Sequence, residues 1–268
     1  MRVLDATLAP WPYVEVHDGE GPPALLVHGI LSSRAQWLLN IPALRRVCSP
    51  VVLELWGHGR SPLPDDPSAF SPDSYVELFE AVRDRLGVER WLVVGQSLGA
   101  ALTLRYALQA PDRVIAQVFT NSNSALADAG WQRRMRETAP ATASKLEQGG
   151  RAAIAAMPVH PSRARFLPEP ARTALLEDAA TLEPAAVARA IHHTVPDSSV
   201  RAMVHQNRVP TLLVVGRRER NFAEAHHYAR DQMPMIEIVE FDAGHAVNIG
   251  AADQFDGAVT GFFSRHLD

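Results

Sequence analysis

The stretch from Trp91 to Leu108 changes its pattern at a serine that lies between two glycines. It reads WLVVGQSLGAALTLRYAL, so a short run of β-branched and apolar residues leads through GQSLG into a segment rich in alanine and leucine. The first part is typical of a buried strand and the second of a helix. A sharp strand-to-helix turn crowds the backbone around it, and small residues two positions to either side relieve that crowding. Gly95 and Gly99 hold those positions, which predicts a tight junction with Ser97 at its tip.

Short apolar runs alternate with helical patterns along most of the 268-residue chain. This alternation predicts an α/β fold, in which helices cover a mostly parallel sheet. The expected strands lie in the stretches YVEV, PALLV, SPVVLEL, WLVVG, RVIAQVF, VPTLLVV and MIEIVEF. Residues 72–86 show helical spacing, with Ser71 as the expected amino-terminal cap and Gly87 at the end.

The pattern changes between residues 124 and 205. This segment is rich in alanine, arginine and proline and contains helical pieces such as ARTALLEDAATL, but no convincing strand. We therefore expect one sheet domain, formed by residues 1–123 and 206–268, with a helical insertion at 124–205.

Composition indicates the compartment and the partners. The formal net charge is −4, without the basic excess usual in nucleic-acid binders, so no nucleic-acid partner is expected. Cys48 is the only cysteine, which excludes an internal disulfide and fits a reducing compartment. No stretch approaches the roughly 18 apolar residues of a membrane span, and the first residues lack the apolar run of a signal peptide. We expect a cytoplasmic monomer or homodimer that acts on a small molecule and does not bind membranes.

A serine hydroxyl needs a base to accept its proton and a carboxylate to orient that base before it can act as a nucleophile. His245, in EFDAGHAVNIG, follows an expected strand and a glycine. It is therefore expected at the carboxyl-end edge of the sheet, where Ser97 also lies. The N–H of Leu98 would face an oxyanion at the start of the helix, and LLVHGIL offers a second donor at Ile30 or Leu31.

Together these stretches resemble the α/β-hydrolase superfamily over nearly the whole chain. The resemblance is carried, in order, by HGILSSRAQW, LELWGHGRSP, VVGQSLGAALTLRYA, PTLLVVGRRE and EFDAGHAVNI. It implies an α/β-hydrolase fold with a sheet of about eight strands and a helical cap formed by residues 124–205. It also implies Ser97 as nucleophile, His245 as base, and oxyanion donors at Leu98 and Ile30. Such a site requires no cofactor.

The sequence departs from the family at the third member of the triad. Where the family usually has an aspartate, three residues beyond the glycine that ends LLVVG, this chain has Glu219. Glutamate is chemically adequate, although its arginine neighbours offer it a competing surface ion pair. The family's other acid location holds Asn121, which carries no charge. Asp242, close to His245 in sequence, is the reserve candidate.

Apolar residues near these elements are expected to shape the substrate pocket. Leu31, Trp37 and Trp131 are expected to bind substrate, and some of the cap residues Trp131, Met135, Met157 and Phe166 are expected to shape an apolar acyl or alcohol site. The adjacent pairs His192-His193 and His226-His227 are not expected to face each other on a helix, so no metal site is predicted.

The leading hypothesis is hydrolysis of a carboxylic ester of a small or medium apolar substrate through an acyl-enzyme. On the same triad, the alternatives are hydrolysis of a carbon–carbon bond, opening of a lactone, and elimination as in the menaquinone-pathway synthase. That synthase family tends to carry Ser-x-Gly-Gly-Arg, whereas this chain has SLGAA from Ser97 to Ala101, without the arginine. A non-catalytic small-molecule receptor on the same scaffold is the alternative from another class.

Overall fold

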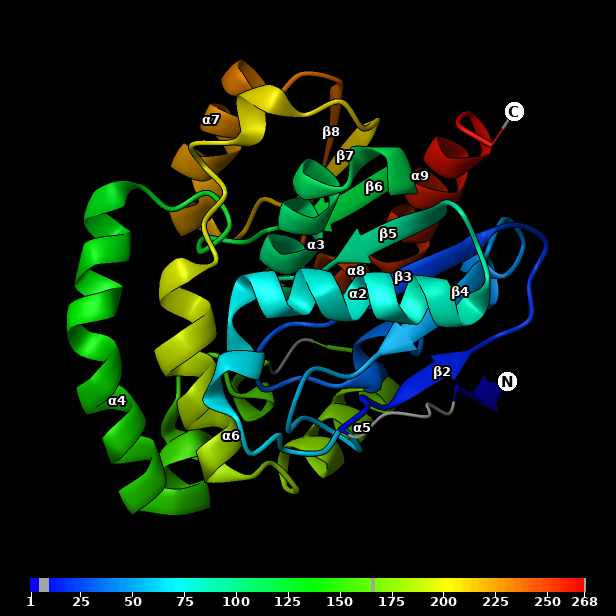
Figure 1. Cartoon of the computed structure of the whole chain (residues 1–268). Helices are drawn as coiled ribbons and strands as arrows, with labels where there is room; N and C mark the ends of the chain where they lie inside the picture. Colours follow the sequence, from blue (N-terminus) through cyan, green and yellow to red (C-terminus); the bar gives the residue numbers. More distant parts are fainter. Residues whose placement is uncertain (5–9, 165–166, 268) are drawn as a thin grey trace.

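The computed structural model describes residues 1–4, 10–164 and 167–267. Within these residues, eight strands form a single sheet in the order β1-β2-β4-β3-β5-β6-β7-β8 (Figure 1). β1 and β2 run antiparallel to their neighbours, and the other strands pair in parallel. The predicted α/β fold with a mostly parallel sheet of about eight strands is confirmed. The strands are β1 (Arg2–Val3), β2 (Val14–Val16), β3 (Pro23–Val27), β4 (Ser49–Leu53), β5 (Trp91–Gly95), β6 (Val114–Thr120), β7 (Thr211–Gly216) and β8 (Ile236–Phe241).

Helices cover both faces of the sheet because the central strands are apolar on both sides. In β3, Leu25 and Val27 pack with α2 and α3, whereas Leu26 belongs to the opposite cluster, which includes residues of α1, α8 and α9. α7 packs beside α3 against β6 and β7. These helices are α1 (Ile41–Leu44), α2 (Pro72–Leu86), α3 (Leu98–Gln109), α7 (Ala223–Gln232), α8 (Val247–Gly250) and α9 (Ala252–Ser264).

The helix expected at residues 72–86 is present as α2, and its ends follow the predicted signals. The Ser71 hydroxyl accepts a hydrogen bond from the N–H of Ser74 at 3.1 Å. Gly87 ends the helix with a φ of +70°, a conformation that glycine adopts at no steric cost. Local side-chain chemistry therefore fixes both boundaries of α2.

In its described residues, the segment between β6 and β7 contains helices joined by turns and no strand, and it stands to one side of the sheet (green to yellow in Figure 1). Its longer helices are α4 (Ala129–Ala156), which bends at Gly150, α5 (Glu169–Ala179) and α6 (Pro184–Arg189). The boundaries at 124 and 205 themselves remain a prediction. This segment packs on itself and on the loop after β3 through the buried apolar cluster Leu31, Ala143, Leu146, Ile154, Ala179, Leu182, Val187 and Ala188.

In the described part of the chain, none of the helices has the length and hydropathy that a membrane crossing requires.

Candidate active site

Ser97 lies at the tip of the junction between β5 and α3, in a strained backbone conformation. Its φ is +54° and its ψ is −117°, a region that residues with a side chain rarely adopt. A Cβ on Gly95 would lie 2.2 Å from the Thr103 hydroxyl, and a Cβ on Gly99 would lie 2.2 Å from the carbonyl oxygen of Val27. The two glycines therefore have no room for a side chain, as the sequence predicts for such a turn.

The loop after β3, residues 28–33, which we call the β3 loop, runs directly against Ser97. A Cβ on Gly29 would lie 2.7 Å from the Cβ and 3.2 Å from the hydroxyl oxygen of Ser97. The N–H of Leu31 donates to Nε2 of His58 at 3.3 Å. Among the described residues, neither the N–H of Ile30 nor that of Leu98 donates to another protein group. Both are therefore available to an oxyanion, whereas the N–H of Leu31 is not.

Two buried histidines support the β3 loop as neutral imidazoles. His58 contacts the carbonyl oxygen of Trp56 through Nδ1 at 3.0 Å, and burial lowers its pKa to about 4. His28 contacts the carbonyl oxygen of Gly29 at 2.7 Å, and burial, aided by His58, lowers its pKa to about 3. A neutral ring that donates from Nδ1 can accept at Nε2, which is how His58 holds the N–H of Leu31.

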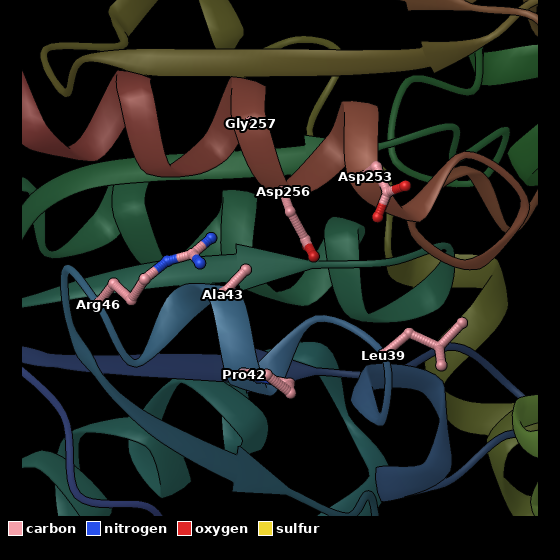
Figure 2. Close-up of a pocket in the computed structure, with 7 residues that line it drawn as sticks. All are labelled: Leu39, Pro42, Ala43, Arg46, Asp253, Asp256 and Gly257. Atoms are coloured by element: carbon pink, nitrogen blue, oxygen red, sulfur yellow. The ribbon is translucent and has the colours of Figure 1, made fainter.

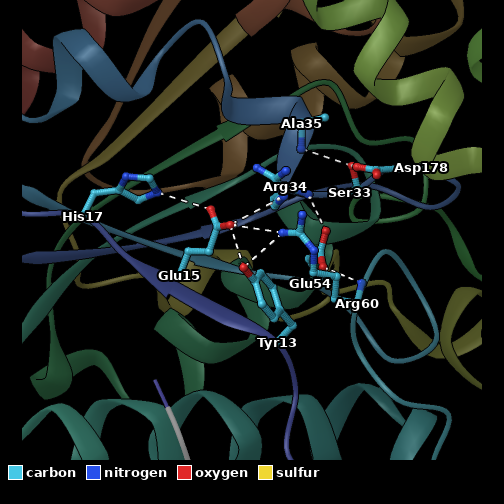
Figure 3. A network of polar contacts seen from close by, with 9 residues as sticks. All are labelled: Tyr13, Glu15, His17, Ser33, Arg34, Ala35, Glu54, Arg60 and Asp178. Carbon is cyan, nitrogen blue, oxygen red and sulfur yellow. Dashed lines mark hydrogen bonds and ion pairs between the residues drawn. The ribbon is translucent and has the colours of Figure 1, made fainter. Parts of the chain in front are cut away.

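A polar network holds the far end of the β3 loop and connects it to α5, in the helical segment between β6 and β7 (Figure 3). The buried carboxylate of Glu54 accepts the N–H of Arg34 at 3.1 Å and that of Arg60 at 2.7 Å, and burial raises its pKa. The hydroxyl of Ser33 donates to Asp178 of α5 at 2.5 Å. The position of the β3 loop is therefore linked to that of a cap helix.

His245 and Glu219, which are 26 residues apart in sequence, lie in contact at the carboxyl ends of β7 and β8. Nδ1 of His245 is 2.8 Å from Oε2 of Glu219. Asn121 donates to the same oxygen at 2.8 Å, and Asn123 donates to Oε1 at 3.3 Å. Burial alone would raise the pKa of Glu219, but the hydrogen bonds from these three side chains outweigh it and leave the pKa below its usual value. Glu219 is thus an ionised carboxylate that orients the imidazole.

Asp242, the reserve acid, lies elsewhere. Its carboxylate forms two hydrogen bonds with the guanidinium of Arg218, at 2.9 and 2.8 Å, and its side chain is 67% exposed. That ion pair lowers the pKa of Asp242. The competing surface ion pair anticipated for Glu219 is therefore made by Asp242.

The structure does not join Ser97 to His245. Within the described ranges, no hydrogen bond links the Ser97 hydroxyl to the imidazole, whose side chain is 38% exposed. Bonds between nucleophile and base are often long in the absence of substrate. The structure brings together two members of the predicted triad, and the serine follows β5 at the same edge of the sheet.

The residues that are expected to contact substrate lie in different parts of the structure. Leu31 is buried against the cap cluster, next to Ile30. Trp131 lies in the first turn of α4 and is partly exposed. Trp37 is fully buried in the core cluster that includes residues of α9, and its contact with substrate stays a prediction. Phe166 lies outside the described residues.

The adjacent histidines also differ from expectation. The rings of His192 and His193 stack with centroids 4.3 Å apart, in a short π-helical turn, and those of His226 and His227 stack at 5.5 Å. Neighbouring side chains leave a helix at different angles, but their rotamers bring the flat rings together. Among the residues that the structure describes, no three histidine, cysteine, aspartate or glutamate side chains are grouped as metal ligands.

Sequence reasoning missed the two asparagines on Glu219. Asn121 also accepts the N–H of Gly216 at 3.0 Å and donates to its carbonyl oxygen at 2.9 Å. The available signal was an uncharged amide at the end of β6, at the edge where the triad was expected. Because Asn121 carries no charge, it was excluded as the triad acid, but it can still donate a hydrogen bond to that acid.

Comparisons with known proteins point to one family. A model described as the alpha/beta hydrolase fold matches residues 22–252. A probable proline iminopeptidase from Streptomyces coelicolor is 38% identical over 125 residues, which are 40% of this chain and 36% of that protein. An acetyltransferase component of the acetoin cleaving system of Pseudomonas putida is 28% identical over 260 residues, 92% of this chain and 64% of that protein. This chain thus spans about a third of the first relative's length and less than two thirds of the second's.

Other relatives include a lipase from Homo sapiens, a carboxylesterase from Bacillus subtilis and a 2-hydroxymuconate semialdehyde hydrolase from a Pseudomonas species, each similar over 35 to 40% of this chain. Among solved structures, MenH from S. aureus superposes with a TM-score of 0.84 over 95% of this chain and 99% of its own, at 18% identity. Because the family model covers most of the sequence and the eight-stranded, mostly parallel sheet has the architecture of that fold, this chain belongs to the α/β-hydrolase fold family.

Proposed function

We propose that this protein is a serine hydrolase that cleaves a carboxylic ester of a small or medium apolar substrate through an acyl-enzyme. The observation that carries the proposal is the 2.8 Å contact between His245 and Glu219, at the edge of the sheet where the strained Ser97 lies. A partly buried, ionised carboxylate on Nδ1 leaves Nε2 of the imidazole free to accept a proton.

In the proposed mechanism, the Ser97 hydroxyl oxygen attacks the ester carbonyl as Nε2 of His245 takes the hydroxyl proton. The oxyanion accepts hydrogen bonds from the N–H groups of Leu98 and Ile30, each worth about 2.7–4 kcal/mol of transition-state stabilisation. The imidazolium, stabilised by Glu219, then protonates the leaving alcohol. Water, deprotonated by His245, attacks the acyl-enzyme in the same way and releases the acid.

The surroundings of the β3 loop support an apolar substrate. Leu31, next to the proposed donor Ile30, is buried in the apolar cluster of the cap. Nearby, His28 and His58 are neutral, because burial lowers the pKa of both. The side chains packed around the loop are therefore apolar or uncharged.

Hydrolysis of a carbon–carbon bond is the second candidate, because one relative that is 34% identical over 114 residues is a 2-hydroxymuconate semialdehyde hydrolase. The elimination reaction is less favoured, since the position expected to carry arginine is Ala101, which is fully buried.

A substrate panel tests the proposal. Wild type and Ser97→Ala are assayed with p-nitrophenyl esters of graded acyl length, with thioesters, with lactones and with a vinylogous 1,5-diketone. We expect turnover of short and medium esters that Ser97→Ala abolishes. Cleavage of the diketone alone would replace the ester assignment by the second candidate, and a protein that turns over no member of the panel and retains no acyl group would fit the receptor.

A further inference from the structure

Two buried amide side chains join the segment that carries His245 to the segment that follows the β3 loop. Asn248 lies three residues after His245, in α8, and Gln36 lies in the 3₁₀ helix Arg34–Trp37. Nε2 of Gln36 donates to Oδ1 of Asn248 at 2.7 Å, and Nδ2 of Asn248 donates to the carbonyl oxygen of Gln36 at 2.7 Å. Both bonds end on the side chain of Asn248, which therefore cannot turn without breaking them.

On one side the pair reaches the β3 loop. The hydroxyl of Ser32 donates to Oε1 of Gln36 at 3.0 Å, and the N–H of Ser32 donates to the carbonyl oxygen of Gly29 at 3.3 Å. Ser32 is two residues beyond Ile30, the proposed oxyanion donor. The chain of hydrogen bonds therefore runs from the histidine segment into the loop that lies against Ser97.

On the other side the pair is held by Asn40. Its amide nitrogen donates to the carbonyl oxygen of Asn248 and to Oδ1 of Asp256, both at 2.8 Å, and its oxygen accepts Nδ2 of Asn248 at 3.0 Å. Asp256 points toward α1 and lines a groove of about 410 Å³ between α1 and α9 (Figure 2). The cluster thus extends from a surface groove to the neighbourhood of the proposed active site.

These amides are buried, and their partners are other protein groups. Asn40 and Asn248 are 0% exposed and Gln36 is 3% exposed. A buried amide that loses a partner costs about 1–3 kcal/mol, because water cannot replace it, and linked hydrogen bonds strengthen one another. The arrangement therefore has one low-energy geometry.

α8 depends on such contacts for its position. It is a single turn, Val247–Gly250, too short to be stable by itself. Glu219 fixes the orientation of the His245 ring, but it does not fix where the backbone of residue 245 lies relative to the β3 loop.

We infer that Asn248, together with Gln36, is a positioning residue that holds the His245 segment in register with the β3 loop. The inference rests on the proposed function. The base His245 and the proposed donor Ile30 lie on segments about 200 residues apart in sequence, and the Gln36–Asn248 pair connects these segments beside the Asn40–Asn248 bond and the apolar packing of Ile249 with Ala35. A displacement of about 1 Å in such a site can lower the rate about 10²-fold.

The test compares Asn248→Ala with Asn207→Ala. Asn207 is a matched control because it is also a buried amide, 4% exposed, with hydrogen bonds to Val209, Thr211 and Pro234 just before the start of β7, at the opposite edge of the sheet from Ser97. Both variants are expected to lose similar stability. We expect Asn248→Ala to lower kcat roughly 10- to 100-fold with little change in KM, and Asn207→Ala to keep kcat within about twofold.

A second readout separates this inference from the proposed function. Hydrogen exchange of the peptide covering residues 243–251 is expected to accelerate in Asn248→Ala and not in Asn207→Ala, whether or not an ester is turned over. If Asn248→Ala does not fold, Asn248→Asp and Gln36→Glu, which keep the shape of the side chains, are expected to show the same kcat loss. Equal kcat for the two alanine variants, or unchanged exchange at 243–251, would overturn the inference. Inactivity of the wild type toward every ester would instead refute the proposed function.

Discussion

The carboxylate of Glu219 accepts hydrogen bonds from one imidazole and from two side-chain amides. Asn121 and Asn123 donate to its two oxygens, and the nearby arginine Arg218 pairs with Asp242 instead. Both carboxylate oxygens of Glu219 are thus held by residues that follow β6. At the scale of single residues, the uncharged Asn121 supports the acid rather than replacing it.

The first prediction concerns the choice of acid. Glu219→Gln is expected to lower kcat by about 10⁴-fold, because an amide neither stabilises the imidazolium nor holds the reactive tautomer. Asp242→Asn is expected to keep kcat within about twofold, since its carboxylate is engaged with Arg218 at the surface. Steady-state kinetics of the two variants with the best ester measure the difference, and loss of activity in Asp242→Asn alone would reverse the assignment.

At the scale of elements, the junction between β5 and α3 can be tested through its glycines. Gly99→Ala is expected to lower the free energy of unfolding by about 1–3 kcal/mol, because the new Cβ would lie 2.2 Å from a backbone oxygen that cannot move freely. Gly261→Ala, at an open position of α9, is the control. It is expected to raise stability by about 0.5–1 kcal/mol through helix propensity. Urea unfolding of both variants measures the effect, and a stabilised Gly99→Ala would contradict the close packing.

Elements with a local signature could be predicted from the sequence. The strands around β5, the capped helix α2 and the glycine-flanked turn at Ser97 each depend on residues close together in the chain. The two-residue strand β1 could not be predicted, because a stretch so short has no pattern of its own.

Contacts between distant residues also escaped prediction. The Gln36–Asn248 pair joins residues 212 positions apart, and no periodicity marks it. Trp37 is a similar case, since its sequence does not show that the 3₁₀ helix places its indole in the core. The identity of the acid was left open for the same reason, since the partners of Glu219 come from another strand.

At the scale of the whole molecule, Asp256 in the groove between α1 and α9 makes the free energy of unfolding depend on pH. Burial and the nearby charge of Asp253 raise the pKa of Asp256, whereas the hydrogen bond from Asn40 and the charge of Arg46 lower it. The resulting pKa is about 6, against 3.8 for a free aspartate. The folded state therefore binds this proton more tightly than the unfolded state does. The stability contributed by the neutral carboxyl is present at low pH and is lost as the pH rises from about 4 through 6.

Asp256→Asn removes this dependence and is expected to be more stable than wild type at pH 8 by about 1–3 kcal/mol, with little difference at pH 4. The amide keeps an acceptor for Asn40. Asp65→Asn removes the same charge from an exposed position outside the groove and is the control. Thermal unfolding at the two pH values measures the effect, and an equal change for both variants would show that net charge, not burial, is responsible.

The most direct test of the central claim is to identify the acylated residue. Wild type is mixed with p-nitrophenyl acetate, quenched in acid within the first turnovers and digested, and the peptides are analysed by mass spectrometry. We predict an acetyl group on the hydroxyl of Ser97, accompanied by a burst of nitrophenol, and neither in Ser97→Ala. Acetylation of another residue, or an undiminished burst in Ser97→Ala, would contradict the account.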